Sequence, residues 1–198
     1  MMKKILIAII AILMAPAVSF ACSFTFDVSL VSTTLDATRS ANNTLGFDNW
    51  YVWKYRVDVV SGNTNPGSYH NGHQNPSPAF SDWELQLPDC YIVSPSLFHE
   101  IEASADQGGG DQIRVYNFEG KTTNDLHFGF KGLKWDLESG DQLNEIGEYD
   151  YFWFSAPTDQ SIEKDWGLKA GTNILRGDVD VPACPECGHQ NPGVPERL

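Results

Sequence analysis

The sequence predicts an all-β protein, an antiparallel β-sandwich of the immunoglobulin-like or jelly-roll kind. Apolar residues alternate with polar ones along most of the chain, which is typical of strands with one buried face. Helical spacing of apolar residues is nearly absent. The alternating runs are short and are separated by clusters of Gly, Asn, Asp and Ser, which favour tight turns. Many short strands joined by such turns are typical of a sandwich of two sheets.

The clearest strand is expected at residues 51–59, where Trp53, Tyr55 and Val57 alternate with polar neighbours. A helical turn is expected at residues 94–105, and a long surface loop at residues 63–81, which are rich in Asn, Gly, Pro and Ser. In all we expect nine strands, at residues 24–30, 51–59, 83–87, 113–118, 126–130, 133–137, 149–155, 164–170 and 173–179.

Residues 1–21 have the pattern of a secretory signal peptide. Lys3 and Lys4 precede an apolar stretch, and small residues stand before the expected cleavage site after Ala21. The apolar stretch is shorter than the ~20 residues that a membrane-spanning helix needs. We therefore expect a single domain at residues 22–181, a Pro-rich tail at residues 182–198, and no stable membrane insertion after cleavage. The expected location is secreted: extracellular, at the cell surface or periplasmic. Lipidation of Cys22 is an alternative, although Phe20 fits a lipoprotein signal poorly.

The chain is acidic, with 26 Asp and Glu against 13 Lys and Arg, a net charge of -13 in 198 residues. Cleavage of the signal would remove Lys3 and Lys4 and change this charge to -15. Affinity for nucleic acid and for anionic membrane surfaces comes mainly from Lys and Arg. The composition therefore argues against nucleic acid and other extended polyanions as partners.

Four cysteines in an exported protein favour disulfides. Three pairings are open, and we favour Cys90 with Cys184 because each follows a strand-like run through a short Pro-containing segment. That pairing leaves Cys22 to bond with Cys187. A zinc knuckle or a redox pair at Cys184 and Cys187 is the alternative, but no second pair of cysteines stands at the spacing of a zinc ribbon.

No catalytic motif is present, and we expect no cofactor. His70 and His73 could bind a transition metal, but a solvated loop explains them as well. Calcium is the other ion that the loop carboxylates allow. Its candidate ligands are Asp106, Asp111, Asp141 and Asp159. Pairs of carboxylates resemble those of glycosidases but are expected on solvent-facing sides of strands, where their pKa would not be raised. These pairs are Asp82 and Glu84, Asp136 and Glu138, Glu145 and Glu148, and Asp178 and Asp180.

Aromatic residues are the remaining signal, because aromatic faces stack on sugar rings and anchor interfaces. Most of the six tryptophans must belong to the core. The candidate ligand-binding rings are Trp50, Trp135 and Trp153, and Trp50 and Phe47, which flank a predicted strand, are candidates for exposed rings. Residues 149–154 are apolar on both sides, so either the strand is covered twice or one side is an exposed patch.

The order of several segments resembles a loose group of uncharacterised exported bacterial surface domains, in which a strand ends in Leu-Pro-x-Cys and a later Cys closes the domain. The segments are Trp53 to Val59, Ser81 to Cys90, Gly132 to Asp136, Tyr151 to Phe154, and Ala183-Cys184. The resemblance implies an extracellular β-sandwich with a Cys90 to Cys184 bridge, and no catalytic residue.

The sequence thus favours a noncatalytic domain for binding or adhesion at the cell surface, with a glycan or a surface protein as partner. The alternatives are a secreted hydrolase acting on polysaccharide and a structural subunit of a surface layer.

Overall fold

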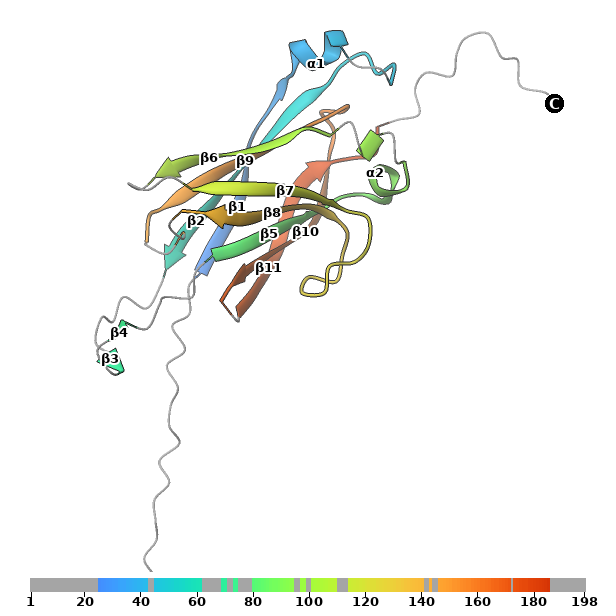
Figure 1. The fold of residues 1–198 in the computed structure, drawn as a ribbon. Coiled ribbons are helices and arrows are strands. Elements are labelled where there is room, and N and C mark those ends of the chain that lie inside the picture. The colour runs from blue at the N-terminus through green and yellow to red at the C-terminus, as the bar shows by residue number, and fades with distance from the viewer. Residues whose placement is uncertain are drawn as a thin grey trace, which may run out of the picture.

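The computed structural model describes residues 25–42, 45–61, 69–70, 73–74, 80–94, 97–98, 101–109, 114–140, 143, 146–171 and 173–185. Two antiparallel sheets pack face to face (Figure 1), which confirms the predicted β-sandwich. One sheet has four strands in the order β1-β2-β9-β6. They are β1 (Thr25–Leu35), β2 (Tyr51–Ser61), β9 (Tyr149–Ala156) and β6 (Ala103–Gly109).

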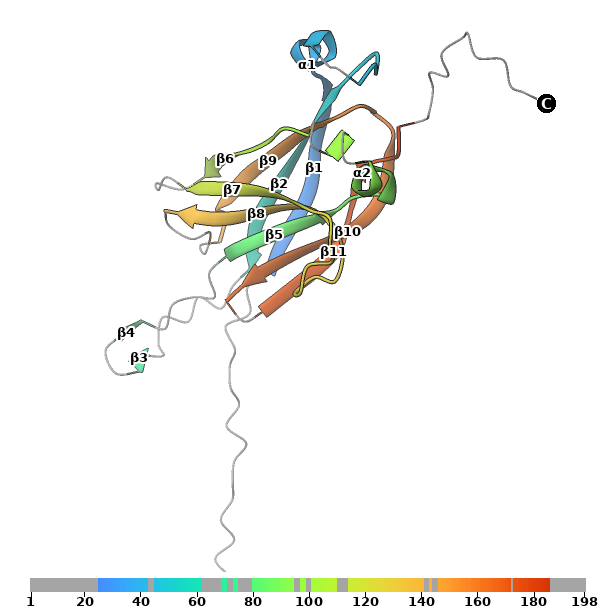
Figure 2. The ribbon, with the colours of Figure 1, turned by 45° about the vertical axis from the view of Figure 1, so that its right-hand side comes forward.

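The second sheet has five strands in the order β11-β10-β5-β8-β7. Their bounds are β11 (Asn173–Pro182), β10 (Ser161–Ala170), β5 (Phe80–Gln86), β8 (Gly132–Ser139) and β7 (Val115–Lys121). The edges of the sandwich are close to one another, because β1 lies against β11 and β6 lies against β7 (Figure 2). Three short elements complete the described chain: α1 (Ala37–Asn42), α2 (Asp89–Val93) and a small hairpin of β3 (Tyr69–His70) and β4 (His73–Gln74).

The alternation along β2 explains how this strand divides its side chains. Trp53, Tyr55 and Val57 have no accessible surface, whereas the intervening Lys54 and Arg56 are half-buried on the other face. Strand geometry sends successive side chains to opposite faces of a sheet. The inner face of β2 therefore belongs to the core and its outer face to the surface.

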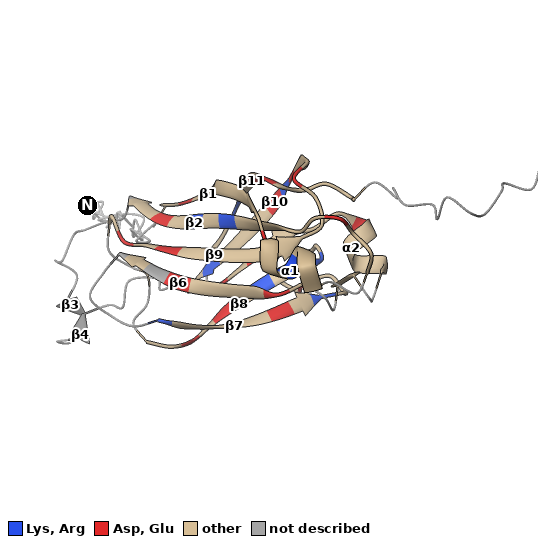
Figure 3. Cartoon of the chain, turned by 90° about the horizontal axis from the view of Figure 1, so that it is seen from above, with Lys and Arg blue, Asp and Glu red and all other residues tan. Residues whose placement is uncertain are grey.

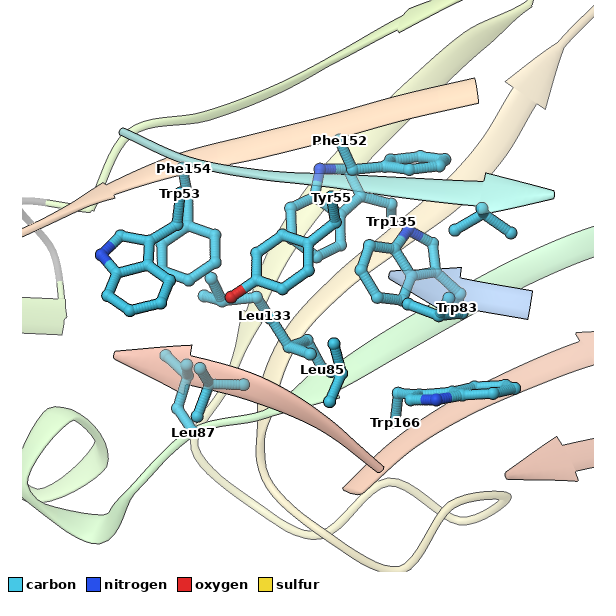
Figure 4. Close-up of a cluster of buried hydrophobic side chains, with 14 of the residues drawn as sticks. Trp53, Tyr55, Trp83, Leu85, Leu87, Leu133, Trp135, Phe152, Phe154 and Trp166 are labelled. Atoms are coloured by element: carbon cyan, nitrogen blue, oxygen red, sulfur yellow. The ribbon is translucent and has the colours of Figure 1, made fainter. Parts of the chain in front are cut away.

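Aromatic rings from both sheets fill the core (Figure 4). The Tyr55 ring stacks on Phe154 with centroids 5.9 Å apart, and Trp83 stacks on Trp135 at 4.8 Å. Phe152 meets Trp83 edge to face at 5.1 Å and so joins the two sheets. Offset-stacked and edge-to-face contacts of this kind are the arrangements that aromatic pairs favour.

Eight of the nine predicted strands are confirmed, with boundaries that differ by a few residues. The strand predicted at residues 126–130 is wrong: these residues form a tight loop, in which Asp125 accepts hydrogen bonds from the N–H groups of His127 and Phe128. The helical turn predicted at residues 94–105 is correct only in part. Leu97 and Phe98 are helical, but residues 103–109 form β6, a strand with few large apolar side chains.

The predicted disulfide between Cys90 and Cys184 is present, with Cα atoms 5.8 Å apart. It connects α2 to the chain just beyond β11. Tyr91, next to Cys90, donates a hydrogen bond from its hydroxyl to the carbonyl oxygen of Ala183 at 2.9 Å. The disulfide therefore joins two segments that this hydrogen bond also connects. It links α2, which follows β5, to the segment that follows β11.

Several predictions concern residues outside those described. These are the signal peptide at residues 1–21, most of the tail at residues 182–198, the pairing of Cys22 with Cys187, and the proposed calcium ligands Asp111 and Asp141. The backbones of His70 and His73 pair with each other in the hairpin of β3 and β4, within the segment predicted to be a long loop.

Candidate ligand-binding site

The outer face of the four-stranded sheet has a row of aromatic rings along β9. Tyr149, Tyr151 and Trp153 are half-buried on this face, while Phe152 and Phe154 have no accessible surface on the other. The sequence left open whether this strand is covered on both faces or has one exposed side. The structure shows the latter: one face of β9 lies in the core, and the other carries partly exposed rings.

Two cations from β2 lie over these rings (Figure 3 views this face). The Lys54 ammonium is 3.9 Å from the Tyr151 ring centroid and 6.0 Å from that of Trp153. The Arg56 guanidinium carbon is 3.8 Å from the Tyr149 centroid. Cations over aromatic faces are attracted by about 0.5–1 kcal/mol each at exposed sites. These contacts hold the basic side chains flat against the sheet.

The two cations differ in their other partners. Arg56 donates a hydrogen bond from Nε to the Asp58 carboxylate at 2.8 Å, and this bond raises the pKa of the guanidinium. Lys54 has no carboxylate within ion-pair distance among the residues that the structure describes. Lys54 is therefore a positive charge that remains available on this face.

A pocket of about 250 Å³ opens beside Trp153. β9 contributes Trp153 and Ser155, and β2 contributes Val52. Residues 102–104, at the start of β6, contribute a carboxylate and a hydroxyl. The full lining is Asp36, Val52, Glu102, Ala103, Ser104, Trp153 and Ser155. One aromatic ring, two small apolar side chains, two hydroxyls and two carboxylates thus surround a space open to solvent.

The two carboxylates of the pocket are held in place by nearby groups. Asp36 accepts a hydrogen bond from the Ser155 hydroxyl at 2.8 Å and another from the backbone N–H of Arg39 at 2.9 Å. Glu102 pairs with the Arg39 guanidinium at 2.6 Å, although 82 % of the Glu102 side chain is exposed. Both carboxylates line the pocket and retain the capacity to accept further hydrogen bonds, since a carboxylate can accept about four.

Only one of the three predicted ligand-binding tryptophans is in this pocket. Trp50, expected to be exposed, is fully buried: Arg39 from α1 lies 4.5 Å over its ring and Phe47 packs edge-on against it. The expected exposure of Trp50 is therefore wrong, and Phe47 is half-buried rather than exposed. Trp135 is also fully buried, in the stack with Trp83. Neither ring can contact a ligand from solvent in this structure.

The pocket residues other than Trp153 were not predicted as a site. Asp36, Glu102 and Ser155 are far apart in sequence and come together because β9 pairs with β2 on one side and β6 on the other. A local signal existed only for Lys54, which stands on the polar side of the alternating run at residues 51–59.

A second group of charged residues lies on the outer face of the five-stranded sheet. The Lys134 ammonium is 3.1 Å from Asp136, 3.7 Å from Asp125 and 4.0 Å from Asp82. Glu84 stands directly opposite Lys134 in the register of β5 and β8, yet neither of its oxygens has a hydrogen-bond partner among the described residues.

The solvent-facing position expected for Asp82 and Glu84 is wrong. Glu84 has no accessible surface, and burial, together with the charge of Asp125, raises the pKa of its carboxyl from 4.5 to about 8. Burial also raises the pKa of Asp82. At neutral pH Glu84 is therefore predominantly protonated.

The loop between β7 and β8, residues 122–131, causes this burial. In Figure 2 the loop turns back across β5 and β10. Phe128 is almost fully buried, and a Cβ atom on Gly167 would lie 2.3 Å from the Phe128 ring. Gly167 stands opposite Glu84 in the register, so both face the loop. A polysaccharide cannot reach Glu84 in this arrangement, and the glycosidase-like pair Asp82 and Glu84 is not an accessible site.

Within the described ranges, no three His, Cys, Asp or Glu side chains are grouped so that they could hold a metal ion. Of the suggested calcium ligands in this part of the chain, Asp106 and Asp159 are exposed and lie on separate segments. No helix among the described residues has the length and apolar character needed to cross a membrane.

Comparison with models of known protein families and with curated proteins found no match. Among the described residues, the outer face around Trp153 has a pocket open to solvent, whereas Glu84 on the other outer face is buried.

Proposed function

We propose that this protein is a secreted or cell-surface binding domain without catalytic activity, and that the pocket beside Trp153 holds one sugar unit of a glycan. The observation that carries the proposal is the combination in one open pocket of a half-buried tryptophan with hydroxyl and carboxylate acceptors. Tryptophan presents a flat apolar surface to the C–H face of a sugar ring. Carboxylates and serine hydroxyls accept the hydrogen bonds that sugar hydroxyls donate.

The size of the pocket supports a single ring rather than a long stretch of polysaccharide. Its volume of about 250 Å³ is slightly below the range of about 300–1,000 Å³ of sites for drug-sized molecules. Export to an oxidising compartment agrees with the Cys90 to Cys184 disulfide and with the signal-like residues 1–21.

The test is binding of the purified mature protein to a glycan array, followed by titration calorimetry with the best oligosaccharides. Trp153→Ala should lower the affinity at least tenfold. Tyr149→Ala is the matched control, because Tyr149 is an aromatic residue on the same face of the same strand but does not line the pocket. Equal loss in both variants, or binding that neither changes, contradicts the pocket as the site.

Two further measurements address the alternative functions. Release of reducing sugar from a bound glycan, abolished by Asp136→Asn, would replace the binding role with that of a hydrolase. Concentration-dependent self-association on gel filtration, lost on changing an exposed residue of an edge strand, would instead favour a structural subunit of a surface layer.

A further inference from the structure

Lys54 lies just beyond the lining of the pocket beside Trp153, on the same face of β2 and β9. Val52 stands opposite Ser155, and both line the pocket. Lys54 stands opposite Trp153, one step further on the same face. Two residues along a strand correspond to about 7 Å. The Lys54 ammonium lies one step further still, 3.9 Å from the Tyr151 ring and 6.0 Å from the Trp153 ring. The acceptor Asp36, bonded to Ser155, and the Lys54 ammonium over Tyr151 are therefore associated with positions about 13 Å apart on β9, with Trp153 between them.

The Lys54 side chain is arranged to receive a negative charge. Its ammonium is held over Tyr151 at 3.9 Å, which fixes its position without neutralising its charge. Several other basic side chains are paired with carboxylates: Arg39 with Glu102, Arg56 with Asp58, and Lys121 with Glu119. Lys54 has no carboxylate partner among the described residues and stands opposite Trp153, which lines the pocket.

We infer that the pocket selects an acidic sugar at the end of a glycan, with its ring on Trp153, its carboxylate paired with Lys54, and its hydroxyls donating to the Asp36 end. This inference rests on the proposed function. A bond between an ammonium and a carboxylate is stronger than one between neutral groups, so the carboxylate adds selectivity. The net charge of -13 disfavours a polymer of acidic units relative to a glycan with one terminal charge.

Sialic acids and uronic acids both supply a terminal carboxylate, and separate probes distinguish them. The first pair is 3′-sialyllactose and its methyl ester, and the second pair is aldotriouronic acid and its methyl ester. Esterification removes the charge and leaves the ring unchanged. Titration calorimetry of the mature protein should give an affinity about tenfold higher for the free acid of at least one pair than for its ester.

Variants of Lys54 assign the selectivity to this residue. Lys54→Gln should lower the affinity for the acid to that for the ester and leave the affinity for the ester unchanged, whereas Lys54→Arg should keep the preference. Lys164→Gln, on the other sheet, is the control for the loss of one positive charge. Near-UV circular dichroism shows whether each variant is folded.

The outcomes separate this inference from the proposed function. Equal binding of acid and ester, or a preference that survives Lys54→Gln, overturns the acidic selectivity and leaves the glycan site in place. Tighter binding of oligogalacturonate than of the singly charged probes contradicts selection of a single terminal charge. If no glycan, charged or neutral, binds in a manner that depends on Trp153, both proposals fall.

Discussion

The titration of Glu84 tests whether the loop at residues 122–131 covers the outer face of the five-stranded sheet. The folded protein holds the proton of this carboxyl with a pKa of about 8, against 4.5 in ordinary surroundings. Between these two pH values the unfolded chain has lost the proton and the folded chain retains it, so the free energy of unfolding must fall as the pH rises. The contribution is fully present below pH 4.5 and is lost by about pH 8.

The magnitude follows from the width of this window. The two pKa values differ by about 3.5 units, and each unit corresponds to 1.36 kcal/mol, so the upper limit of the effect is about 5 kcal/mol. Glu84→Gln removes the ionisation and nearly keeps the shape of the side chain. At pH 5 the variant should unfold with a free energy within about 1 kcal/mol of the wild type, because the protonated acid and the amide are both neutral and both unpartnered.

At pH 9 the variant should be more stable than the wild type by several kcal/mol, because the wild type must bury a charge beneath Phe128. The assay is urea unfolding followed by tryptophan fluorescence at pH 5, 7 and 9. With a slope of about 2 kcal/mol per molar urea, a gain of ~3 kcal/mol moves the midpoint by roughly 1.5 M. Glu163→Gln is the matched control, since Glu163 is exposed on β10. Parallel pH profiles of the wild type and Glu84→Gln would refute the reasoning.

Other perturbations follow from the packing. Replacing both Cys90 and Cys184 by Ser should cost about 4–5 kcal/mol of unfolding free energy, because the bridge closes a loop with a sequence separation of 94; an unchanged urea midpoint would contradict this. Gly167→Ala should lower the free energy of unfolding by roughly 1–3 kcal/mol and expose Glu84, since the new methyl group meets the Phe128 ring. Faster amide exchange in residues 122–131 would report that this loop is displaced. Trp135→Ala should lower the free energy of unfolding by about 3–5 kcal/mol, because a fully buried ring is removed from the core. A decrease below ~1 kcal/mol, measured by thermal unfolding, would contradict the central position of this ring.

Strands whose inner residues are large and apolar were predictable from the sequence. In β2 the alternation is long, and burial of one face is the only arrangement that removes Trp53, Tyr55 and Val57 from water together. β6 was missed because its residues Ala103–Gly109 carry little apolar surface, and the strand forms by pairing with β9. Residues 126–130 look apolar, but Asp125 bonds to the loop backbone and favours a turn over a strand.

The sequence by itself determined the fold class, most of the strands and, where apolar and polar residues alternate, which face of the strand points inward, because these depend on local alternation and on chain order. It favoured the pairing of Cys90 with Cys184 among the three pairings that it left open. Only the tertiary structure decided which polar faces meet solvent. A loop that folds back over β5 turns Glu84 from an expected surface carboxylate into a buried acid. The pairing of β9 with β2 and β6 creates the pocket at Trp153 and places Lys54 opposite Trp153 on the same face. Both results depend on contacts between residues distant in sequence, and the alternation along a single strand carries no information about such contacts.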